Sequence, residues 1–337
     1  MQRPYFLIHT ISPIMKNLRI VFMGTPEFAV ATLGSLLING FNVVSVVTAP
    51  DKPSGRGRKI AKSEVKNFAE FSELPVLQPL SLKDPEFISI LKSLNADMFI
   101  VVAFRMLPEA VWKIPPLGTI NLHASLLPDY RGAAPINHAI INGETRTGVT
   151  TFLIDEKIDT GKILLREDVQ IFPFENAGDL HEKLMKLGAR LVIKTIEEIS
   201  ENKIKPLSQA DLINSMSLKL APKIHPEDCI INWYSDVTII NNLVRGLSPY
   251  PCAKSWFKND SVLLSFKIFS SQPEIEKHSF TPGTILSDGK SYLKICGKDG
   301  FLNINSIQVE GKKRMNTTEF LNGFDVTKFT IPINLPA

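Results

Sequence analysis

The residues best suited to chemistry lie in the stretch NLHASLLPDYRGAAP, residues 121–135. Its first half has the pattern of a buried strand, and its second half is typical of a loop that leads into a helix. Side chains alternate between the two faces of a strand, so Asn121 and His123 point to the same side. An amide can donate to a developing oxyanion, and an imidazole can move protons near neutral pH.

A second stretch supplies carboxylates. The predicted strand GVTTFLID ends in the loop DEKIDTG, which offers Asp155, Glu156 and Asp159. Doubly wound sheets present ligands at the carboxyl ends of their strands, where we expect both stretches to meet. A carboxylate could orient His123 and stabilise its charged form. Taken singly, such a histidine is more often structural and Asp-Thr-Gly is more often a turn. Because the chain has no GxSxG and no suitably placed Cys, the set favours acyl transfer without a covalent nucleophile.

The elements around these stretches alternate between strand and helix from residue 18. Five apolar runs read as buried strands: LRIVFMG, FNVVSVVTAP, ADMFIVVAF, GTINLHA and GVTTFLID. Continuous apolar strands separated by helices predict a Rossmann-like, doubly wound, mostly parallel sheet. The first turn, GTPEFA, has one glycine where a dinucleotide site needs three, which excludes NAD or FAD binding.

The second half of the chain has a different pattern of apolar runs and turn residues. The periodicity lapses over residues 203–219, which we interpret as a linker between a catalytic domain, 15–202, and a C-terminal domain, 220–337. In the latter, short runs separated by turn dipeptides predict a small β-barrel (OB-like). The dipeptides are Asn259-Asp260, Asp288-Gly289 and Asp299-Gly300. Residues 1–14 lack the pattern of a packed element, and we expect an unstructured extension there.

The composition excludes several classes of protein. Its three cysteines are scattered, without a CxxC pattern, which argues against a disulfide framework or a zinc cluster and fits the reducing cytoplasm. No apolar run approaches the roughly 20 residues that cross a bilayer, so we expect no membrane association. No group of His, Cys and carboxylates has metal-ligand spacing, so no metal is predicted.

Positive charge is concentrated in one segment, DKPSGRGRKIAK, residues 51–62. It holds Lys52, Arg56, Arg58, Lys59 and Lys62 against a single acidic residue, an excess equal to the net charge of +4 of the whole chain. A charge run is usually a solvated face. Here Pro53 and two glycines indicate a loop, which is better suited to gripping phosphates of a nucleic acid.

The stretch NLHASLLPDYRGAAPIN, with IDEKIDTG about thirty residues later, resembles the formyltetrahydrofolate-dependent formyltransferases. The resemblance implies that Asn121, His123 and Asp159 form the active site. It also implies a folate site lined by the following residues and by the segment AFRMLP: Ser125, Leu126, Leu127, Pro128, Phe104 and Leu107. In AFRMLP, Arg105 stands where the family has glycine, and the segment is one residue shorter.

Other segments resemble the tRNA-specific branch of this family. They are VFMGTPEFA, DKPSGRGRK, LAPKIHPED, INW and IQVEGKKRMNTTEFLNG, and the likeness runs from about residue 15 to the end. It implies a monomer that transfers the formyl group of 10-formyltetrahydrofolate to methionyl initiator tRNA for translation initiation. It also implies that the C-terminal domain binds tRNA together with Lys52, Arg56, Arg58 and Lys59.

Two other interpretations remain open at the level of sequence. The same three active-site residues could serve a sugar-nucleotide or glycinamide ribonucleotide formyltransferase, although the basic loop and the second domain argue against both. A non-catalytic RNA-binding module that kept the fold is the third possibility, and the intact Asn, His and Asp set argues against it.

Overall fold

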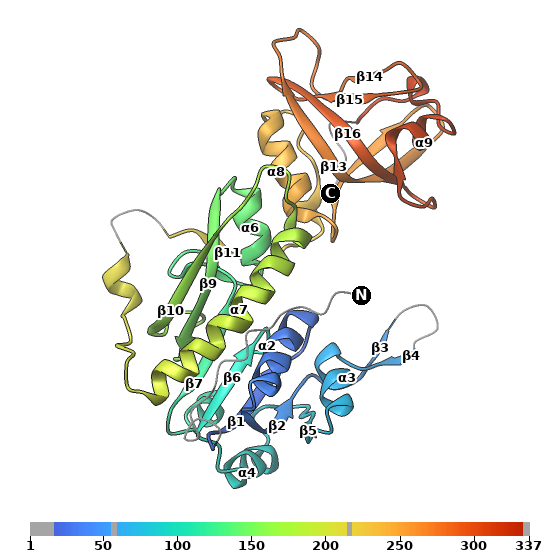
Figure 1. The fold of residues 1–337 in the computed structure, drawn as a ribbon. Helices are drawn as coiled ribbons and strands as arrows, with labels where there is room; N and C mark the ends of the chain where they lie inside the picture. Colours follow the sequence, from blue (N-terminus) through green and yellow to red (C-terminus); the bar gives the residue numbers. More distant parts are fainter. Residues whose placement is uncertain (1–16, 55–58, 214–217, 333–337) are drawn as a thin grey trace. The chain divides into compact units, whose positions relative to one another are not determined.

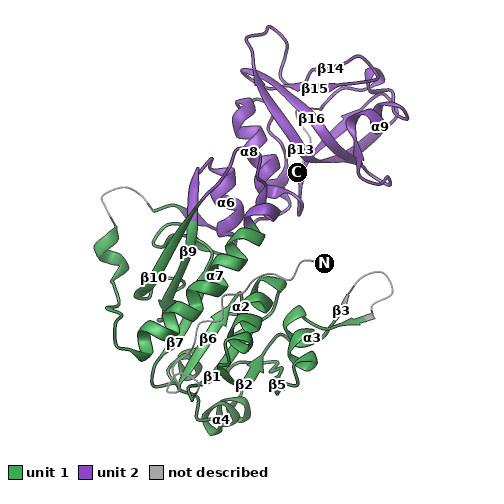
Figure 2. Cartoon of the chain, in the orientation of Figure 1, with its two compact units in different colours: residues 1–132, 148–169, 181–219 green, residues 133–147, 170–180, 220–337 purple. Residues whose placement is uncertain are grey.

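The computed structural model describes residues 17–54, 59–213 and 218–332 (Figure 1). The predicted extension, residues 1–14, therefore lies outside the described residues. The chain forms two compact units, each drawn from several stretches of sequence (Figure 2). Unit 1 comprises residues 1–132, 148–169 and 181–219, and unit 2 comprises residues 133–147, 170–180 and 220–337.

Unit 1 is organised around a seven-stranded sheet with the order β10-β9-β7-β6-β1-β2-β5. The strands are β1 (Arg19–Gly24), β2 (Asn42–Val47), β5 (Val76–Leu77), β6 (Met98–Val102), β7 (Thr119–His123), β9 (Arg146–Leu153) and β10 (Ile163–Gln170). Neighbouring strands from β5 to β7 are parallel, and β9 is antiparallel to β7. The predicted Rossmann-like, mostly parallel sheet is confirmed.

Helices cover both faces of this sheet. They are α2 (Glu27–Ile38), α3 (Glu64–Phe71), α4 (Pro85–Ser93), α5 (Glu109–Trp112) and α7 (Ala177–Ser200). On one face, Phe87 of α4 and Val111 of α5 share a buried cluster with Val101 of β6. On the other face, Gly188 of α7 lies against Leu122 of β7, close enough that a Cβ on it would come within 2.7 Å. Asn121 pairs with Val101 in the parallel ladder. Asn121 and His123 therefore point to the face of α4 and α5.

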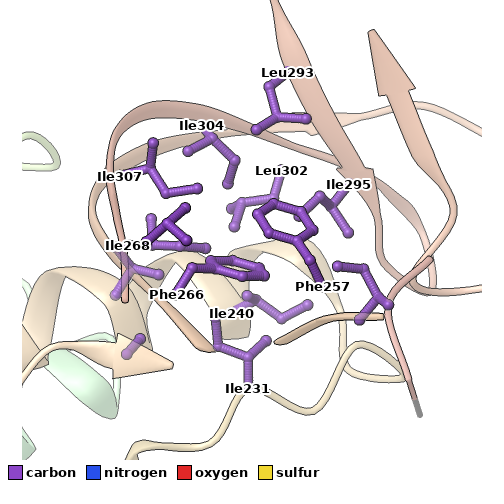
Figure 3. Packing of buried hydrophobic residues seen from close by; sticks show 14 of the residues in the cluster. Ile231, Ile240, Phe257, Phe266, Ile268, Leu293, Ile295, Leu302, Ile304 and Ile307 are labelled. Atoms are coloured by element: carbon purple, nitrogen blue, oxygen red, sulfur yellow. The ribbon is translucent and has the colours of Figure 1, made fainter. Parts of the chain in front are cut away.

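Unit 2 contains an antiparallel sheet with the order β12-β13-β16-β15-β14, and β17 pairs with β16. These strands are β12 (Ala253–Lys258), β13 (Leu263–Ile275), β14 (Ile285–Ser287), β15 (Leu293–Cys296), β16 (Gly300–Val309) and β17 (Met315–Asn316). Two of the predicted turn dipeptides fall between consecutive strands of this set, and the third, Asp299-Gly300, lies at the start of β16. The sheet curls around an apolar cluster, which confirms the small C-terminal β-domain (Figure 3).

Short elements complete the two units. They are α6 (Pro135–Ile141), α8 (Val237–Leu247), α9 (Thr317–Leu321), β8 (Arg131–Gly132), β11 (Leu220–Ala221), η2 (Glu227–Cys229) and η3 (Val326–Lys328). Within the described ranges, no helix combines the length and apolar character needed to cross a bilayer.

Aromatic packing holds the centre of unit 2. Phe257 of β12 and Phe266 of β13 are stacked with ring centroids 4.1 Å apart, and both are buried. Ile240 of α8 packs into the same cluster, so the helix and the sheet share one core (Figure 3).

Replacing Phe257 by Ala should therefore lower the free energy of unfolding by about 3–5 kcal/mol, the usual range for a buried Phe. Chemical denaturation monitored by circular dichroism measures this change. Phe71→Ala is the matched control, because Phe71 is 86% exposed and its loss should change stability by no more than about 0.5 kcal/mol. Equal effects of the two changes would contradict the assigned core.

Candidate active site

His123 is the last residue of β7, and its ring is buried between two hydrogen-bond acceptors. Its Nε2 lies 2.8 Å from the carbonyl oxygen of Tyr130. A carbonyl only accepts, so Nε2 carries a proton and donates it. Its Nδ1 lies 3.8 Å from Oδ2 of Asp159. At this distance the contact is electrostatic rather than a hydrogen bond.

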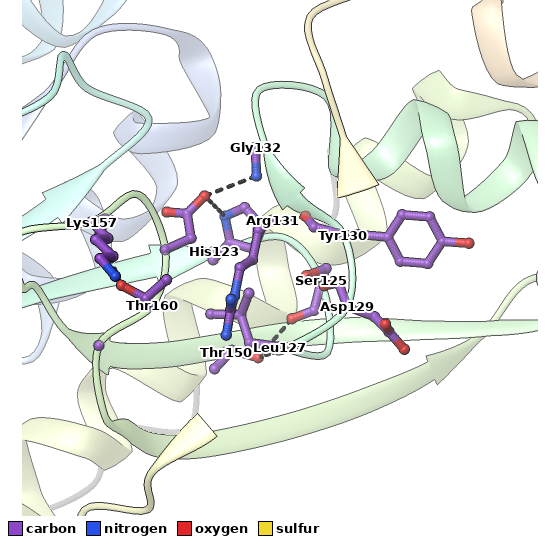
Figure 4. Close-up of polar contacts among 12 residues, drawn as sticks. His123, Ser125, Leu127, Asp129, Tyr130, Arg131, Gly132, Thr150, Lys157 and Thr160 are labelled. Atoms are coloured by element: carbon purple, nitrogen blue, oxygen red, sulfur yellow. Dashed lines mark hydrogen bonds and ion pairs between the residues drawn. The ribbon is translucent and has the colours of Figure 1, made fainter. Parts of the chain in front are cut away.

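Asp159 is held in place by a backbone contact as well as by the histidine. Gly132 donates its N–H to the same Oδ2 at 2.9 Å (Figure 4). Asp159 itself adopts a left-handed backbone conformation, with φ of 55°. Such a conformation is uncommon for a residue with a side chain and persists only where its surroundings enforce it.

The other two carboxylates of this loop, those of Asp155 and Glu156, are placed differently. Asp155 accepts from the N–H of Lys157 at 3.1 Å and from the hydroxyl of Thr160 at 2.7 Å. These two hydrogen bonds shape the turn from which Asp159 reaches His123. Glu156 is exposed. Among the three carboxylates that the sequence offered, the structure brings Asp159 to His123.

The chain brings Asp159 to His123 in a different way from the one that we expected. We expected both stretches to meet because their strands end at one edge of the sheet. That reason is wrong, since β9 is antiparallel to β7 and its last residue, Leu153, pairs with Ile120. The loop after β9 instead folds back across β7, and Gly161 passes so close to Leu153 that a Cβ would lie 1.6 Å from its carbonyl oxygen.

Asn121 lies two residues before His123 on the same face of β7, about 7 Å away along the strand. It is half-buried. Its amide makes no side-chain hydrogen bond within the described residues, so its N–H groups are available to a bound molecule.

The loop that follows β7 is pinned to the neighbouring strands. The Thr150 hydroxyl donates to the Ser125 carbonyl at 2.6 Å and accepts from the N–H of Leu127 at 3.1 Å (Figure 4). Arg166 donates to the Leu127 carbonyl at 3.0 Å. Thr150 and Arg166 were not among the residues that sequence reasoning picked out, because neither belongs to a recognisable motif.

The predicted folate residues divide into buried and accessible ones. Ser125 and Leu127 are fully buried, so their side chains belong to the supporting wall. Leu126 and Pro128 are half-buried. Phe104 follows β6, which lies beside β7 in parallel, and thus stands at the same sheet edge as His123.

Leu107 is buried in the cluster shared by α4 and α5, and Phe104 packs against that cluster. Arg105, between them, donates to the carbonyls of Pro79 at 2.9 Å and Leu80 at 3.2 Å. Burial lowers the pKa of its guanidinium. The unusual arginine thus ties the segment to a neighbouring loop.

Two short strands of the basic segment, residues 51–62, pair with each other as a hairpin. β3 (Lys52–Ser54) pairs antiparallel with β4 (Lys59–Ala61), and Lys52 is exposed. The predicted tRNA contacts Arg56 and Arg58 lie outside the described residues. Lys59 lies in β4.

Two charges at the edges of this segment are neutralised by α3. Lys66 binds Asp51 at 2.6 Å, and this hydrogen bond lowers the pKa of Asp51. Lys62 pairs with Glu70 at 2.6 Å, which raises the pKa of Lys62. Asp51, the acidic residue of the segment, is thus paired with a lysine outside it.

Family models match most of the chain. Residues 18–196 match the formyl transferase model, and residues 223–325 match the model of the formyl transferase C-terminal domain. The chain belongs to the formyl transferase family.

Relatives within this family are close. The methionyl-tRNA formyltransferase of Bacteroides fragilis is 50% identical over 314 residues, which cover 93% of this chain and 97% of the relative. That of Flavobacterium johnsoniae is 52% identical over 309 residues, covering 92% and 97%.

Solved formyl transferases share the fold at lower identity. The sugar 3N-formyl transferase WlaRD, solved with dTDP and 5-N-formyl-THF, has a TM-score of 0.62 and 23% identity, covering 88% of this chain and 99% of its own. The Helicobacter canadensis N-formyltransferase, in complex with folinic acid and dTDP-3-aminofucose, has a TM-score of 0.60 and 22% identity, covering 88% and 100%.

Substituting Gly161 by Ala should push the loop away from Leu153 and separate Asp159 from His123. We expect formyl transfer to fall at least about tenfold, since small misplacements of catalytic groups are costly. Gly323→Ala is the control, because a Cβ there meets nothing within 4 Å. A Gly161→Ala enzyme as active as the control would show that the tight loop is dispensable. Melting temperature and turnover should be measured for both.

Proposed function

We propose that this chain transfers the formyl group of 10-formyltetrahydrofolate to the α-amino group of methionyl initiator tRNA. The observation that carries the proposal is the identity of about 50% to methionyl-tRNA formyltransferases over more than nine-tenths of the chain. The similarity includes both family domains, so it extends beyond the part that any folate-dependent formyltransferase would share.

The reaction exchanges one amide bond for another. The neutral amine of the methionyl group attacks the formyl carbon and forms a C–N bond, and the carbonyl oxygen becomes an oxyanion. When the carbonyl re-forms, the bond to N10 of the folate breaks. N10 takes up one proton while the amine loses one, so no outside oxidant or reductant is required.

The three site residues divide these tasks. The amide of Asn121 donates to the oxyanion. Nδ1 of His123 makes no hydrogen bond to Asp159, whose Oδ2 lies 3.8 Å away, so the N–H that it carries in the imidazolium can serve the substrate. Asp159 stabilises the charged imidazolium and orients it, while the Tyr130 carbonyl holds Nε2 at 2.8 Å.

The folate would lie beside this set at the sheet edge. We assign its pocket to residues at the ends of β6 and β7: Phe104, Leu107, Ser125, Leu126, Leu127 and Pro128. The buried members shape the wall. The chemistry requires no metal.

The tRNA would be bound by the hairpin of β3 and β4 and by unit 2. Lys52 and Lys59 lie on its two strands, and the sequence adds Arg56 and Arg58 between them in chain order. We infer that the enzyme acts as a monomer in the cytoplasm. The free, buried thiols Cys229, Cys252 and Cys296 are consistent with a reducing compartment.

Asn121→Ala and His123→Ala should each lower turnover by roughly 10² or more, the usual effect of losing an oxyanion donor or an acid-base group. Folding should survive in both. The assay supplies 10-formyltetrahydrofolate with methionyl initiator tRNA, elongator methionyl-tRNA or a dTDP-amino sugar. Turnover of the sugar instead of the initiator tRNA would overturn the proposed function. A variant within about threefold of wild type would remove that residue from the mechanism.

Arg56→Ala should weaken tRNA binding and leave folate affinity unchanged. Each lost phosphate contact lowers the slope of log K against log salt by roughly one unit. Arg56→Lys should restore only part of the loss, because a guanidinium bonds as a planar fork. Binding is measured across a salt series with folate affinity in parallel. Unchanged tRNA affinity and slope would rule out the contact, and a parallel loss of folate affinity would mean that the loop supports the pocket.

A further inference from the structure

The segment predicted as a linker, residues 203–219, is attached to unit 1 along part of its length. Leu207 and Ile163 of β10 exchange both backbone hydrogen bonds, each at 2.8 Å. Leu212 packs against the cluster formed by Leu127, Phe152 and Ile163. These contacts bring the short helix η1 (Gln209–Leu212) against the two loops that carry the site.

Gln209, the first residue of η1, is only 3% exposed, and its amide is fully bonded. Its Nε2 donates to the carbonyl oxygen of Asp159 at 2.9 Å and to that of Gly161 at 2.8 Å. Its Oε1 accepts from Arg131, from Nε at 3.1 Å and Nη2 at 2.7 Å.

The orientation of this amide follows from its neighbours. A guanidinium only donates and two carbonyls only accept, so the oxygen must face Arg131 and the nitrogen must face the loop of Asp159. No other uncharged side chain of this length offers both a double donor and an acceptor. A glutamate would keep the bond to Arg131 but would place an oxygen against two carbonyl oxygens.

Hydrogen bonds from Gln209 and Gly132 hold Asp159 by its backbone and by its carboxylate, respectively. Arg131 and Gly132 are adjacent, and Gly132 binds the Asp159 carboxylate at 2.9 Å while Arg131 binds Gln209. Gln209 in turn binds the backbone of Asp159 and of Gly161. The backbone of Asp159 is left-handed, with φ of 55°, a conformation that persists only where its surroundings enforce it.

We propose that Gln209 is a positioning residue, held by Arg131, that fixes the Asp159 carboxylate opposite His123. This role rests on the proposed formyl transfer, because it acts through the carboxylate that serves that reaction. Gln209 itself touches neither substrate. Its loss should lower kcat about 10- to 100-fold, the scale of a misplaced catalytic group, with little change in folate affinity.

Two substitutions test the contact. Gln209→Ala removes the whole amide, whereas Gln209→Glu preserves size and the Arg131 contact and removes only the two donated bonds. If the alanine variant does not fold, the glutamate variant carries the test. Asn39→Ala is the matched control, since Asn39 lies at the C-terminal end of α2, outside the proposed site, and its amide donates to a backbone carbonyl, that of Ser35, at 2.8 Å.

The decisive measurement is a double-mutant cycle with Asp159→Asn, with kcat, folate affinity and melting temperature recorded. If Gln209 acts through Asp159, Gln209→Glu should lower kcat about 10- to 100-fold alone and less than about threefold in the Asp159→Asn background. Equal losses in both backgrounds, or a kcat within threefold of wild type, would overturn the inference.

A spectroscopic readout separates this inference from the proposed function. In protein with ¹⁵N-labelled histidine, Gln209→Glu should shift the ring nitrogen resonances of His123, identified by their loss in His123→Ala, and Asn39→Ala should not. Unchanged His123 resonances would overturn the role of Gln209 whatever acceptor is formylated. If the wild-type enzyme does not formylate methionyl initiator tRNA but Gln209→Glu still shifts the His123 resonances, the proposed function is wrong and the role of Gln209 stands.

Discussion

One carboxylate oxygen holds the site together. Oδ2 of Asp159 accepts from the backbone of Gly132 at 2.9 Å and faces Nδ1 of His123 at 3.8 Å. Three stretches of chain must therefore be placed within fractions of an ångström: the end of β7, the turn at Gly132 and the loop after β9. A hydrogen bond weakens steeply as its geometry departs from ideal, so much of the surrounding structure serves this placement.

The sheet fixes the first of these stretches from both faces. Leu122 points to α7, where Gly188 admits its side chain, so Asn121 and His123 must point the other way. A slip of one residue in β7 would bury the two polar groups under α7 and expose the leucine. Apolar packing of Leu122 thus specifies the orientation of the two groups that we propose act in catalysis, although Leu122 has no chemistry of its own.

Much of the fold followed from sequence because its signals are local. Strands β1, β2, β6 and β7 of unit 1 and the hairpin turns of unit 2 lie where periodicity and turn residues placed them. The direction of β9 could not be predicted in this way, because an apolar run has the same pattern in parallel and antiparallel pairing. Gln209 was also missed, since its three partners are 48 to 78 residues away and no local pattern marks a buried amide.

Two kinds of electrostatics coexist in unit 1, and they respond differently to salt. His123 and Asp159 are 8% and 14% exposed, so mobile ions cannot come between them. The hairpin of β3 and β4 is instead exposed at Lys52, and α3 pairs with Asp51 and Lys62 at its edges. Charges in water are screened beyond about 10 Å at 0.1 M salt. If the hairpin binds tRNA as proposed, ionic strength should accordingly weaken that binding, while the buried pair keeps its geometry and the chemical step its rate.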